Sequence, residues 1–381
     1  VANKWFALLG EREPEVSTYI ISLEADVSLI EKAKEVYPTD NVYLHQAVNG
    51  NNINTYLDYK LFDWYMDSPN KWYNRPLKKG EVGCMLSHLE VLTEAYHEGQ
   101  DYVLVLEEDF KVVKPLDLSV LPEGYDMYYL GRNACDSTVA IDDNFEEAGY
   151  SYNTHAILYR RSAIEKILQG NPQDYIMPWD EYLSATHSDH PRKDLDFIWK
   201  DVKAAAFSEN IVEQISNSAI STIENSDYVS MGILDTRDWE AWKKKWLSYE
   251  ALTKEWDLIT DEPIADVFTF KLFTDEFCEE AIKLANKKDQ WEDDRHEFYP
   301  TIDVLLSKIG LDEAYSRVLK EYVYPCAIHL WTLEGPDWGN MYSENFMIKY
   351  TEEKQGHLSL HHDFSDISCV LALNEEYEGG G

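Results

Sequence analysis

Residues 102–109 read YVLVLEED, a continuous apolar run that ends in three acidic residues. An apolar run bounded by charge is typical of a central parallel strand that is buried on both faces. Around it, strand-like runs at 17–23 and 125–130 alternate with segments at 27–36 and 80–98, whose apolar residues recur every three to four positions. This alternation predicts an α/β domain with a mostly parallel sheet.

The acidic residues that follow the run lie where a ligand is expected. Glu107 and Asp109 flank one residue, so an extended chain turns both carboxylates to the same side. Ligands of open α/β sheets bind at the carboxyl ends of the strands, and paired carboxylate oxygens can hold Mn²⁺ or Mg²⁺. The segment therefore predicts a cation site that could bridge a diphosphate, with a solvated acidic loop as the alternative.

The overall charge narrows the choice of partners. The chain has 34 basic and 71 acidic residues, which gives a formal net charge of −37. Such a surface repels phosphate backbones and argues against nucleic acid or anionic membranes as partners. No run reaches the roughly 18 apolar residues of a membrane-spanning helix, so we expect no membrane span. A nucleotide diphosphate would need a cation to approach this protein.

The five cysteines are sparse and scattered, without CxxC spacing: Cys84, Cys135, Cys278, Cys326 and Cys369. An odd number at such spacing predicts buried thiols rather than a disulfide scaffold. Their distribution leaves the redox compartment open.

Four sequence blocks around the acidic cluster follow one another in a recognisable order. They are GEVGCMLSH at 80–88, VLEED at 105–109, YDMYYLGR at 125–132 and MPWDEYL at 177–183, with 207–227 fitting more loosely. The blocks resemble glycosyltransferase family 25, which includes bacterial lipopolysaccharide galactosyltransferases and animal procollagen galactosyltransferases. The resemblance implies a Rossmann-like GT-A fold, UDP-galactose or UDP-glucose as the donor, and an inverting transfer.

The same resemblance implies roles for individual residues. Glu107 and Asp109 would hold the metal, Mn²⁺ or Mg²⁺, and Asp180 and Glu181 lie in the acceptor region. An inverting reaction needs a carboxylate to deprotonate the acceptor hydroxyl, and we expect Asp180 to do so, with Glu181 as the second candidate. The alternative for this pair is a pair of helix N-terminal acids behind Pro178.

Other residues have weaker expectations. Arg132 could contact a phosphate or a sugar hydroxyl, or form a surface ion pair, and His155 is a candidate donor contact. His88 lies inside the expected helix, where a histidine is more often structural. Collagen-type relatives end this domain with a histidine-containing stretch, but 211–221 (IVEQISNSAIS) has none, which leaves the third metal ligand undefined.

The sequence changes character near residue 235. A single helix over 238–256 would place its tryptophans on one stripe, either packed on a domain or forming a sugar-stacking platform. Beyond it we expect one helix at 275–288. Further strands are expected at 267–272, 322–328, 345–350 and 367–373.

A second chemical signal lies near the end of the chain. A strand would place His361 and Asp363 on one face, as two arms of the 2-His-1-carboxylate triad of non-haem Fe(II) oxygenases. With 345–350 before it and EGGG at 378–381 after it, the block resembles the carboxyl-terminal domain of procollagen lysyl hydroxylases. The resemblance implies a double-stranded β-helix (jelly-roll) fold with Fe²⁺ and 2-oxoglutarate, Tyr350 as a cosubstrate contact, and a homodimer through this domain.

In that family the third iron ligand and the basic partner of 2-oxoglutarate lie beyond the EGGG block. Two ligands hold iron weakly, so we expect no oxygenase activity from this chain and expect it to be an excerpt from a longer enzyme. The expected organisation is a GT-A transferase domain over 1–234, a bridging helix over 235–262, and a partial oxygenase domain over 263–381.

Together these features predict a metal-dependent hexosyltransferase that modifies hydroxylysine in collagen-like acceptors. A surface of net charge −37 would attract such basic acceptors. The alternatives are an oxygenase whose transferase-like half only docks substrate, and a degenerate binding module without turnover. The compartment would be the ER lumen for an animal collagen-modifying enzyme, and the cytoplasm in a viral, bacterial or algal setting.

Overall fold

The chain divides into two compact units, Val1–Val229 and Ser230–Gly381, in the computed structural model. The structure describes residues 15–53, 56–136, 138–215, 223, 225–293, 301–333, 343–351, 361, 363 and 365–374. Within these ranges no helix is both long and apolar enough to cross a bilayer. The functional boundaries that we expect after residues 234 and 262 stay predictions.

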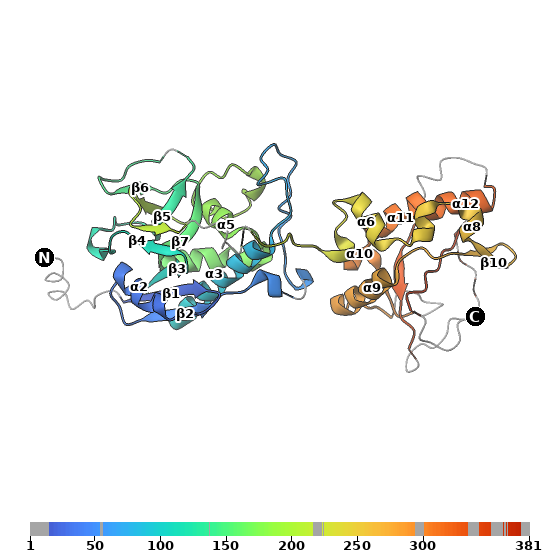
Figure 1. Ribbon diagram of the computed structural model, residues 1–381, viewed down its shortest axis with the longest axis horizontal. Coiled ribbons are helices and arrows are strands. Elements are labelled where there is room, and N and C mark those ends of the chain that lie inside the picture. Colours follow the sequence, from blue (N-terminus) through green and yellow to red (C-terminus); the bar gives the residue numbers. More distant parts are fainter. Residues whose placement is uncertain are drawn as a thin grey trace. The chain divides into compact units, whose positions relative to one another are not determined.

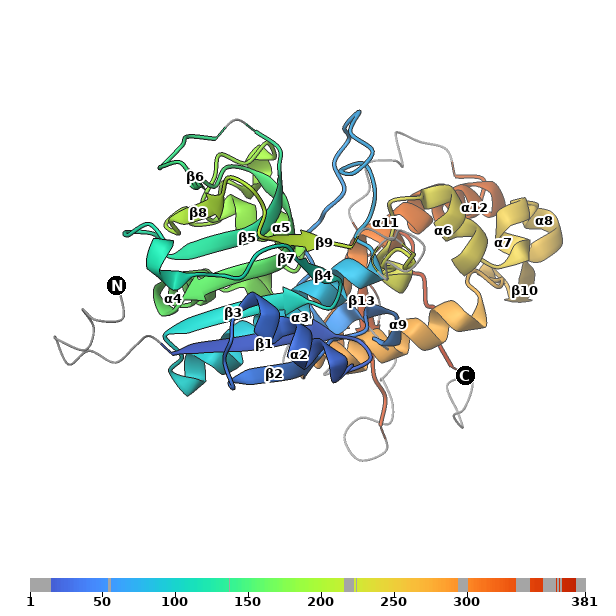
Figure 2. The ribbon, with the colours of Figure 1, turned by 60° about the vertical axis from the view of Figure 1, so that its left-hand side comes forward.

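The first unit is built on a seven-stranded sheet with the order β2-β1-β3-β7-β5-β8-β6 (Figure 1). Its strands, together with the small β4–β9 pair, are β1 Val16–Ser22, β2 Val42–Gln46, β3 Tyr102–Glu107, β4 Phe110–Val112, β5 Met127–Ala134, β6 Phe145–Glu147, β7 Ser151–Arg160, β8 Ala204–Phe207 and β9 Val212–Gln214. Figure 2 shows β1 and β3 side by side in the lower part of this unit.

The sheet is mixed, so the expectation of a mostly parallel sheet is wrong. β1 runs parallel to β2 and β3, and β5 runs parallel to β8. β7, however, lies antiparallel between β3 and β5, and β6 is antiparallel to β8. Parallel neighbours are usually joined by a crossover helix, whereas the connection from β5 to β7 holds only the short strand β6.

The apolar run that begins at Tyr102 is buried in the sheet of this unit, as predicted. Val103, Leu104, Val105 and Leu106 of β3 are all 0% exposed. The helices of the unit are α2 Ser28–Val36, α3 Lys79–Glu98, α4 Arg161–Gln169 and α5 Trp179–Ala185, and the first two confirm the expected helices. Gly99, with φ of 76°, ends α3 in the left-handed conformation that glycine adopts without strain.

The second unit is mainly helical in the part that the structure describes. Its helices are α6 Trp239–Trp246, α7 Tyr249–Thr253, α8 Trp256–Ile259, α9 Asp275–Lys288, α10 Leu306–Ile309, α11 Asp312–Val318, the π-helix η7 Leu319–Val323 and α12 Tyr324–Leu330. Its strands form two antiparallel pairs, β10 Asp261–Ile264 with β11 Val267–Thr269, and β12 Asp303–Leu305 with β13 Phe346–Ile348. The described residues do not show a jelly roll.

The expected tryptophan helix is broken into three, which corrects the single bridging helix. Ser248 caps α7 by accepting the N–H of Ala251, and Lys254, with φ of 56°, ends it. Trp242 and Trp246 are nevertheless buried, and Trp242 stacks on Trp239 with ring centroids 4.7 Å apart. Packing in the second unit, rather than a sugar platform, accounts for these rings.

Two expected strands of the second unit are also wrong. Residues 322–328 are helical, in η7 and α12, because a short apolar run does not distinguish a buried helix from a strand. Residues 367–373 are irregular. The helix predicted at 275–288 is α9, and the strands predicted at 267–272 and 345–350 are shortened to β11 and β13.

All five cysteine thiols are free, as the spacing predicted. Their burial differs from the expectation, since Cys326 is buried whereas Cys135 and Cys369 are exposed and Cys84 and Cys278 are partly exposed.

Candidate active site

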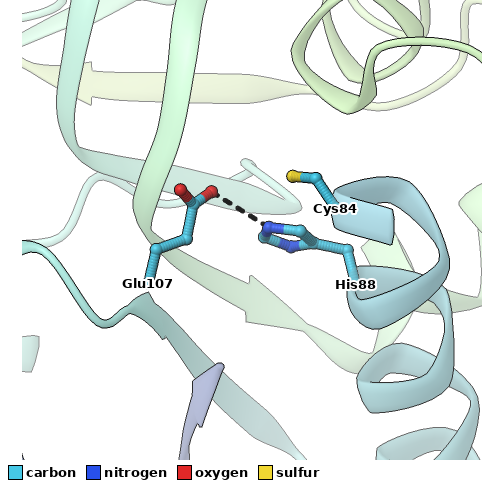
Figure 3. A group of neighbouring side chains, drawn as sticks. All are labelled: Cys84, His88 and Glu107. Carbon is cyan, nitrogen blue, oxygen red and sulfur yellow. Dashed lines mark hydrogen bonds and ion pairs between the residues drawn. The ribbon is translucent and has the colours of Figure 1, made fainter. Parts of the chain in front are cut away.

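The predicted metal ligand Glu107 is the last residue of β3 and contacts two other elements. Its Oε1 accepts a hydrogen bond from Thr154 Oγ1 of β7 at 2.7 Å and lies 3.0 Å from Nε2 of His88 on α3 (Figure 3). Burial alone would raise the pKa of Glu107, but the hydrogen bonds from His88 and Thr154 outweigh it and hold the pKa below its ordinary value. The side chain is therefore an anion that the fold holds in place.

Asp109 is the second predicted metal ligand. Gln214 Nε2 of β9 donates to its Oδ2 at 2.9 Å, whereas its Oδ1 is buried and has no hydrogen-bond partner among the described residues. Burial, followed by the charge of Glu107, raises the pKa of Asp109 to about 6. A buried carboxylate oxygen without a donor is costly unless a cation or a ligand meets it. The pair Glu107 and Asp109 therefore fits a divalent ion.

Glu108, which lies between these two acids, has a structural partner. Its Oε2 accepts hydrogen bonds from Ser22 Oγ at 2.6 Å and from the Leu23 N–H at 3.1 Å. These bonds tie the turn after β3 to the end of β1. The middle acid of the EED triplet thus fixes the loop that carries the other two.

Asp180 is in the first turn of α5 and is partly exposed. Its Oδ2 lies 3.4 Å from the backbone N–H of Asn153, a non-glycine residue with φ of 71° at an irregularity in the pairing of β5 with β7. Burial, followed by the charge of Glu181, raises the pKa of Asp180 to about 7. A carboxylate with this pKa is suited to accept a proton near neutral pH.

Glu181, the next residue, is 0% exposed and has three internal donors. It accepts hydrogen bonds from Trp72 Nε1 at 3.0 Å, Tyr150 OH at 3.1 Å and His190 Nε2 at 2.7 Å. His190 Nδ1 accepts the Arg192 N–H at 3.1 Å, which places the imidazole proton on Nε2. The two adjacent acids therefore lie in different surroundings.

Cys84 shows that residues from separate sequence blocks share one electrostatic environment. Burial, followed by the charges of Glu107, Asp180 and Glu81, raises the pKa of its thiol well above the ordinary value. Glu81 is itself buried and pairs with Arg75, whose Nη1 lies 3.0 Å from its Oε2. Acids from the predicted metal pair and the predicted base Asp180 thus lie within electrostatic range of Cys84 on α3.

Arg132 and His155, which we predicted to contact the sugar donor, are buried and have hydrogen-bond partners within the protein. Arg132 donates from Nη1 to Ser151 Oγ and pairs with Glu146 through Nη2. His155 donates from Nε2 to the Val212 carbonyl at 3.1 Å, and burial lowers its pKa, so the ring is neutral. Contacts of these residues with a donor stay predictions.

Several residues of the site were missed from the sequence. His88, which we interpreted as structural, contacts Glu107 directly, and the four-residue spacing from Cys84 within GEVGCMLSH places both on one face of α3. No local pattern identifies Thr154 or the donors to Glu181, because they come from elements far apart in the sequence.

In the second unit, the predicted iron ligands lie close together but outside any strand. His361 Nε2 is 3.1 Å from Asp363 Oδ1, and Ser368 Oγ donates to Asp363 Oδ2 at 2.5 Å. In the described part of the chain no third His, Cys, Asp or Glu ligand joins this pair. Tyr350 follows β13 and is 49% exposed.

The seven-stranded mixed sheet and the acidic residues at the end of β3 are consistent with a GT-A-like domain. A comparison with protein families agrees with this class, because residues 15–119 match glycosyltransferase family 25 (LPS biosynthesis protein). Residues 15–119 of the first unit are therefore similar to a glycosyltransferase family 25 domain, and this family suggests a transferase that uses a metal ion and a nucleotide-sugar.

Parts of this chain are similar to proteins described as procollagen lysyl hydroxylases and glycosyltransferases and to a member of glycosyltransferase family 25. The procollagen lysyl hydroxylase and glycosyltransferase of Acanthamoeba polyphaga mimivirus is 36% identical over 171 residues, 40% of this chain and 18% of that protein. The multifunctional procollagen lysine hydroxylase and glycosyltransferase LH3 of Rattus norvegicus is 30% identical over 135 residues, 32% and 18% of the two chains. A glycosyltransferase 25 family member of Aedes aegypti is 30% identical over 149 residues, 36% and 24%. The matched part thus spans less than a quarter of each relative.

Proposed function

We propose that the first unit is a metal-dependent, inverting glycosyltransferase that moves galactose or glucose from a UDP-sugar to a hydroxyl acceptor. One observation carries the proposal: Asp109 Oδ1 is buried and has no hydrogen-bond partner in the part of the chain that the structure describes. It lies beside the anionic Glu107, in the same electrostatic environment as the partly exposed Asp180. This arrangement supports a cation site next to a proton acceptor, and the family 25 domain supports a UDP-sugar donor.

Glu107 and Asp109 would hold Mn²⁺ or Mg²⁺ through carboxylate oxygens. The bound ion would supply positive charge for the diphosphate and stabilise UDP as it departs. Thr154 and His88 orient Glu107, and Gln214 orients Asp109, so the two carboxylates need little rearrangement to act as ligands.

Asp180 is the proposed general base. In its ionised form it accepts the proton of the acceptor hydroxyl, whose oxygen then attacks the anomeric carbon from the face opposite UDP. Asn153 and the first turn of α5 orient this carboxylate through backbone N–H groups. Glu181 is enclosed by Trp72, Tyr150 and His190, and we assign it a positioning role for α5.

The proposed acceptor is hydroxylysine in a collagen-like sequence. Two of the similar proteins are described as procollagen lysyl hydroxylases and glycosyltransferases. A basic acceptor also fits a chain with a formal net charge of −37, because opposite charges speed the encounter.

The direct test is to incubate the protein and Mn²⁺ with a hydroxylysine-containing collagen peptide and either UDP-galactose or UDP-glucose. Mass spectrometry should detect one added hexose on hydroxylysine. Asp109→Asn should abolish the addition, whereas Glu213→Gln, at an exposed ion pair with Lys111, should retain it. No addition with either donor would refute the proposal.

The activity of Asp109→Asn and a calorimetric measurement separate the two alternatives. If the first unit only docks substrate for an oxygenase, Asp109→Asn should leave every activity of the protein unchanged. If the unit is a binding module without turnover, calorimetry should detect binding of the partner but no UDP-dependent binding of Mn²⁺.

A second candidate function concerns the second unit. The 3.1 Å contact of His361 Nε2 with Asp363 Oδ1 supports a proposal that these residues are two ligands of Fe²⁺ in a 2-oxoglutarate oxygenase, with Tyr350 near the cosubstrate. Hydroxylation of a lysine-containing collagen peptide by a protein that contains this unit, and its loss in His361→Ala, would support the proposal. Activity that persists in the variant would refute it.

A further inference from the structure

Three side chains with different donor atoms gather at the start of α3 and the end of β3. Cys84 Sγ, a ring nitrogen of His88 and a carboxylate oxygen of Glu107 all lie within 4.8 Å of one another. Figure 3 shows the three side chains converging, with Cys84 and His88 projecting from the helix toward Glu107. Of these, only Glu107 belongs to the carboxylate pair proposed above.

The group is held on rigid elements. Cys84 and His88 are four residues apart on α3, so they lie on one face of the helix. A side chain at Gly83 would place its Cβ 2.4 Å from the Val48 carbonyl oxygen, which shows how closely this turn packs on the backbone before it. Glu107 ends β3, whose four middle residues are fully buried. The three ligand atoms therefore meet through the fold and not through a mobile loop.

The donor set identifies the class of ion. A thiolate, an imidazole and a carboxylate together favour a borderline divalent ion such as Zn²⁺ or Co²⁺, whereas Mg²⁺ and Ca²⁺ prefer oxygen alone. Bonds of about 2.0–2.3 Å in tetrahedral geometry separate neighbouring ligands by roughly 3.3–3.8 Å. The 3.0 Å from His88 Nε2 to Glu107 Oε1, and the outer limit of 4.8 Å, are near enough for side-chain rotation to close the site.

The surrounding charges also favour a cation here. The carboxyl groups of Glu107, Asp180 and Glu81 lie near enough to the sulfur of Cys84 to interact with it electrostatically, and a cation would offset their negative charge. A thiol that coordinates a metal ion gives up its proton. Cys84 is partly exposed, so an ion can reach the site from solvent and a fourth ligand can remain water.

We propose that Cys84, His88 and Glu107 form a three-ligand site for a borderline divalent cation, Zn²⁺ or Co²⁺, adjacent to the oxygen pair of Glu107 and Asp109. The ion is bound by the Cys84 thiolate, His88 and Glu107, and the thiol proton is released to solvent. The site does not depend on the proposed sugar transfer, because it requires neither nucleotide nor acceptor.

Titration of the full chain with Co²⁺ tests the site by absorption spectroscopy. Sulfur coordination gives a thiolate-to-cobalt charge-transfer band in the near ultraviolet, which oxygen and nitrogen ligands alone, including those of His361 and Asp363, do not give. We expect a band that saturates at one equivalent and is lost when Zn²⁺ is added. Cys84→Ser should abolish the band, and His88→Gln should weaken Co²⁺ binding at least tenfold.

The matched control is the double variant Cys135→Ser/Cys369→Ser, which removes the two exposed thiols and should keep the band. Circular dichroism identifies variants that do not fold, and Cys84→Ala provides a second substitution of the same ligand. Absence of the band in the unmodified protein would overturn the proposal. So would a band that survives both Cys84 substitutions or that is lost in the control.

Discussion

Replacing Glu181 by glutamine should destabilise the first unit without removing the proposed base. Glu181 is 0% exposed and accepts from Trp72 Nε1, Tyr150 OH and His190 Nε2. The indole nitrogen can only donate, and the His190 proton is fixed on Nε2 by the Arg192 N–H. A glutamine has one carbonyl oxygen, so its amide NH₂ must face either Trp72 or His190.

The magnitude follows from this count. One buried donor is left unsatisfied, which costs about 1–3 kcal/mol, and the remaining bonds lose a charged acceptor. We expect a total of about 3 kcal/mol, in line with other losses from buried hydrogen-bond networks. At about 1.4 kcal/mol per factor of ten, backbone exchange that requires opening of this region should accelerate roughly a hundredfold.

Hydrogen exchange followed by mass spectrometry measures this locally. Peptides from α5 and β7 should lose protection in Glu181→Gln, whereas peptides from α9 in the second unit are an internal reference. Glu209→Gln is the matched control, since its side chain is 86% exposed, and it should change nothing measurable. Adding Trp72→Phe removes one of the two donors that compete for the single glutamine oxygen, so the amide NH₂ can face position 72, and it should restore about 1 kcal/mol. Unchanged protection of α5 and β7 in Glu181→Gln would refute the reasoning.

Further predictions concern the base, the helix and the cation site. Asp180 accepts a proton only as a carboxylate, and burial, followed by the charges of Glu181 and Glu81, raises its pKa to about 7. We therefore expect kcat/KM for sugar transfer to rise about tenfold per pH unit below pH 7 and to level off above it. A pH profile that is flat from 5 to 8 would contradict this assignment. Gly83→Ala should lower the free energy of unfolding by about 3 kcal/mol, because the new Cβ would meet backbone atoms at 2.4 Å and 2.7 Å. Denaturant titrations measure this loss, and an unchanged midpoint would show that α3 can move to accommodate the methyl group. Since Glu107 belongs to both cation sites, Zn²⁺ should inhibit Mn²⁺-dependent transfer, and Cys84→Ser should be inhibited less; equal inhibition of both proteins would contradict a shared Glu107.

Parts of the fold follow from local sequence alone. The apolar run before Glu107 identified β3, and three-to-four periodicity identified α2 and α3, because one face or both faces of each element must be buried. The direction of the strands could not be predicted, because nothing in the local sequence of β7 identifies the strands with which it pairs. The prediction of a single tryptophan helix was wrong for a different reason. Ser248 caps a new helix, α7, although the periodic pattern of the sequence continues past this residue.

The candidate site divides in the same way. The acids at 107 and 109 were identified because strand periodicity and position after a buried run are local properties. The contact of His88 with Glu107 was not predicted, because the role of a histidine on a helix depends on which residues of the sheet lie opposite it in the fold. Thr154 and Gln214 are ordinary residues in sequence, and their roles arise from the pairing of β7 with β3 and of β9 with β4.

The neighbouring acids Asp180 and Glu181 show how the helix itself resolves an ambiguity that sequence leaves open. Successive residues of an α-helix do not face the same way, so two adjacent acids at the start of α5 cannot serve one site. Glu181 is directed to Trp72, Tyr150 and His190, and its oxygens are occupied by internal donors. Asp180 is partly exposed, and its carboxylate accepts hydrogen bonds from the backbone N–H groups of Asn153 and Glu181, near the charges around Cys84. The choice between the two candidate bases therefore depends on the direction of α5, which the bonds to Glu181 fix, and this is why loss of Glu181 should affect stability before chemistry.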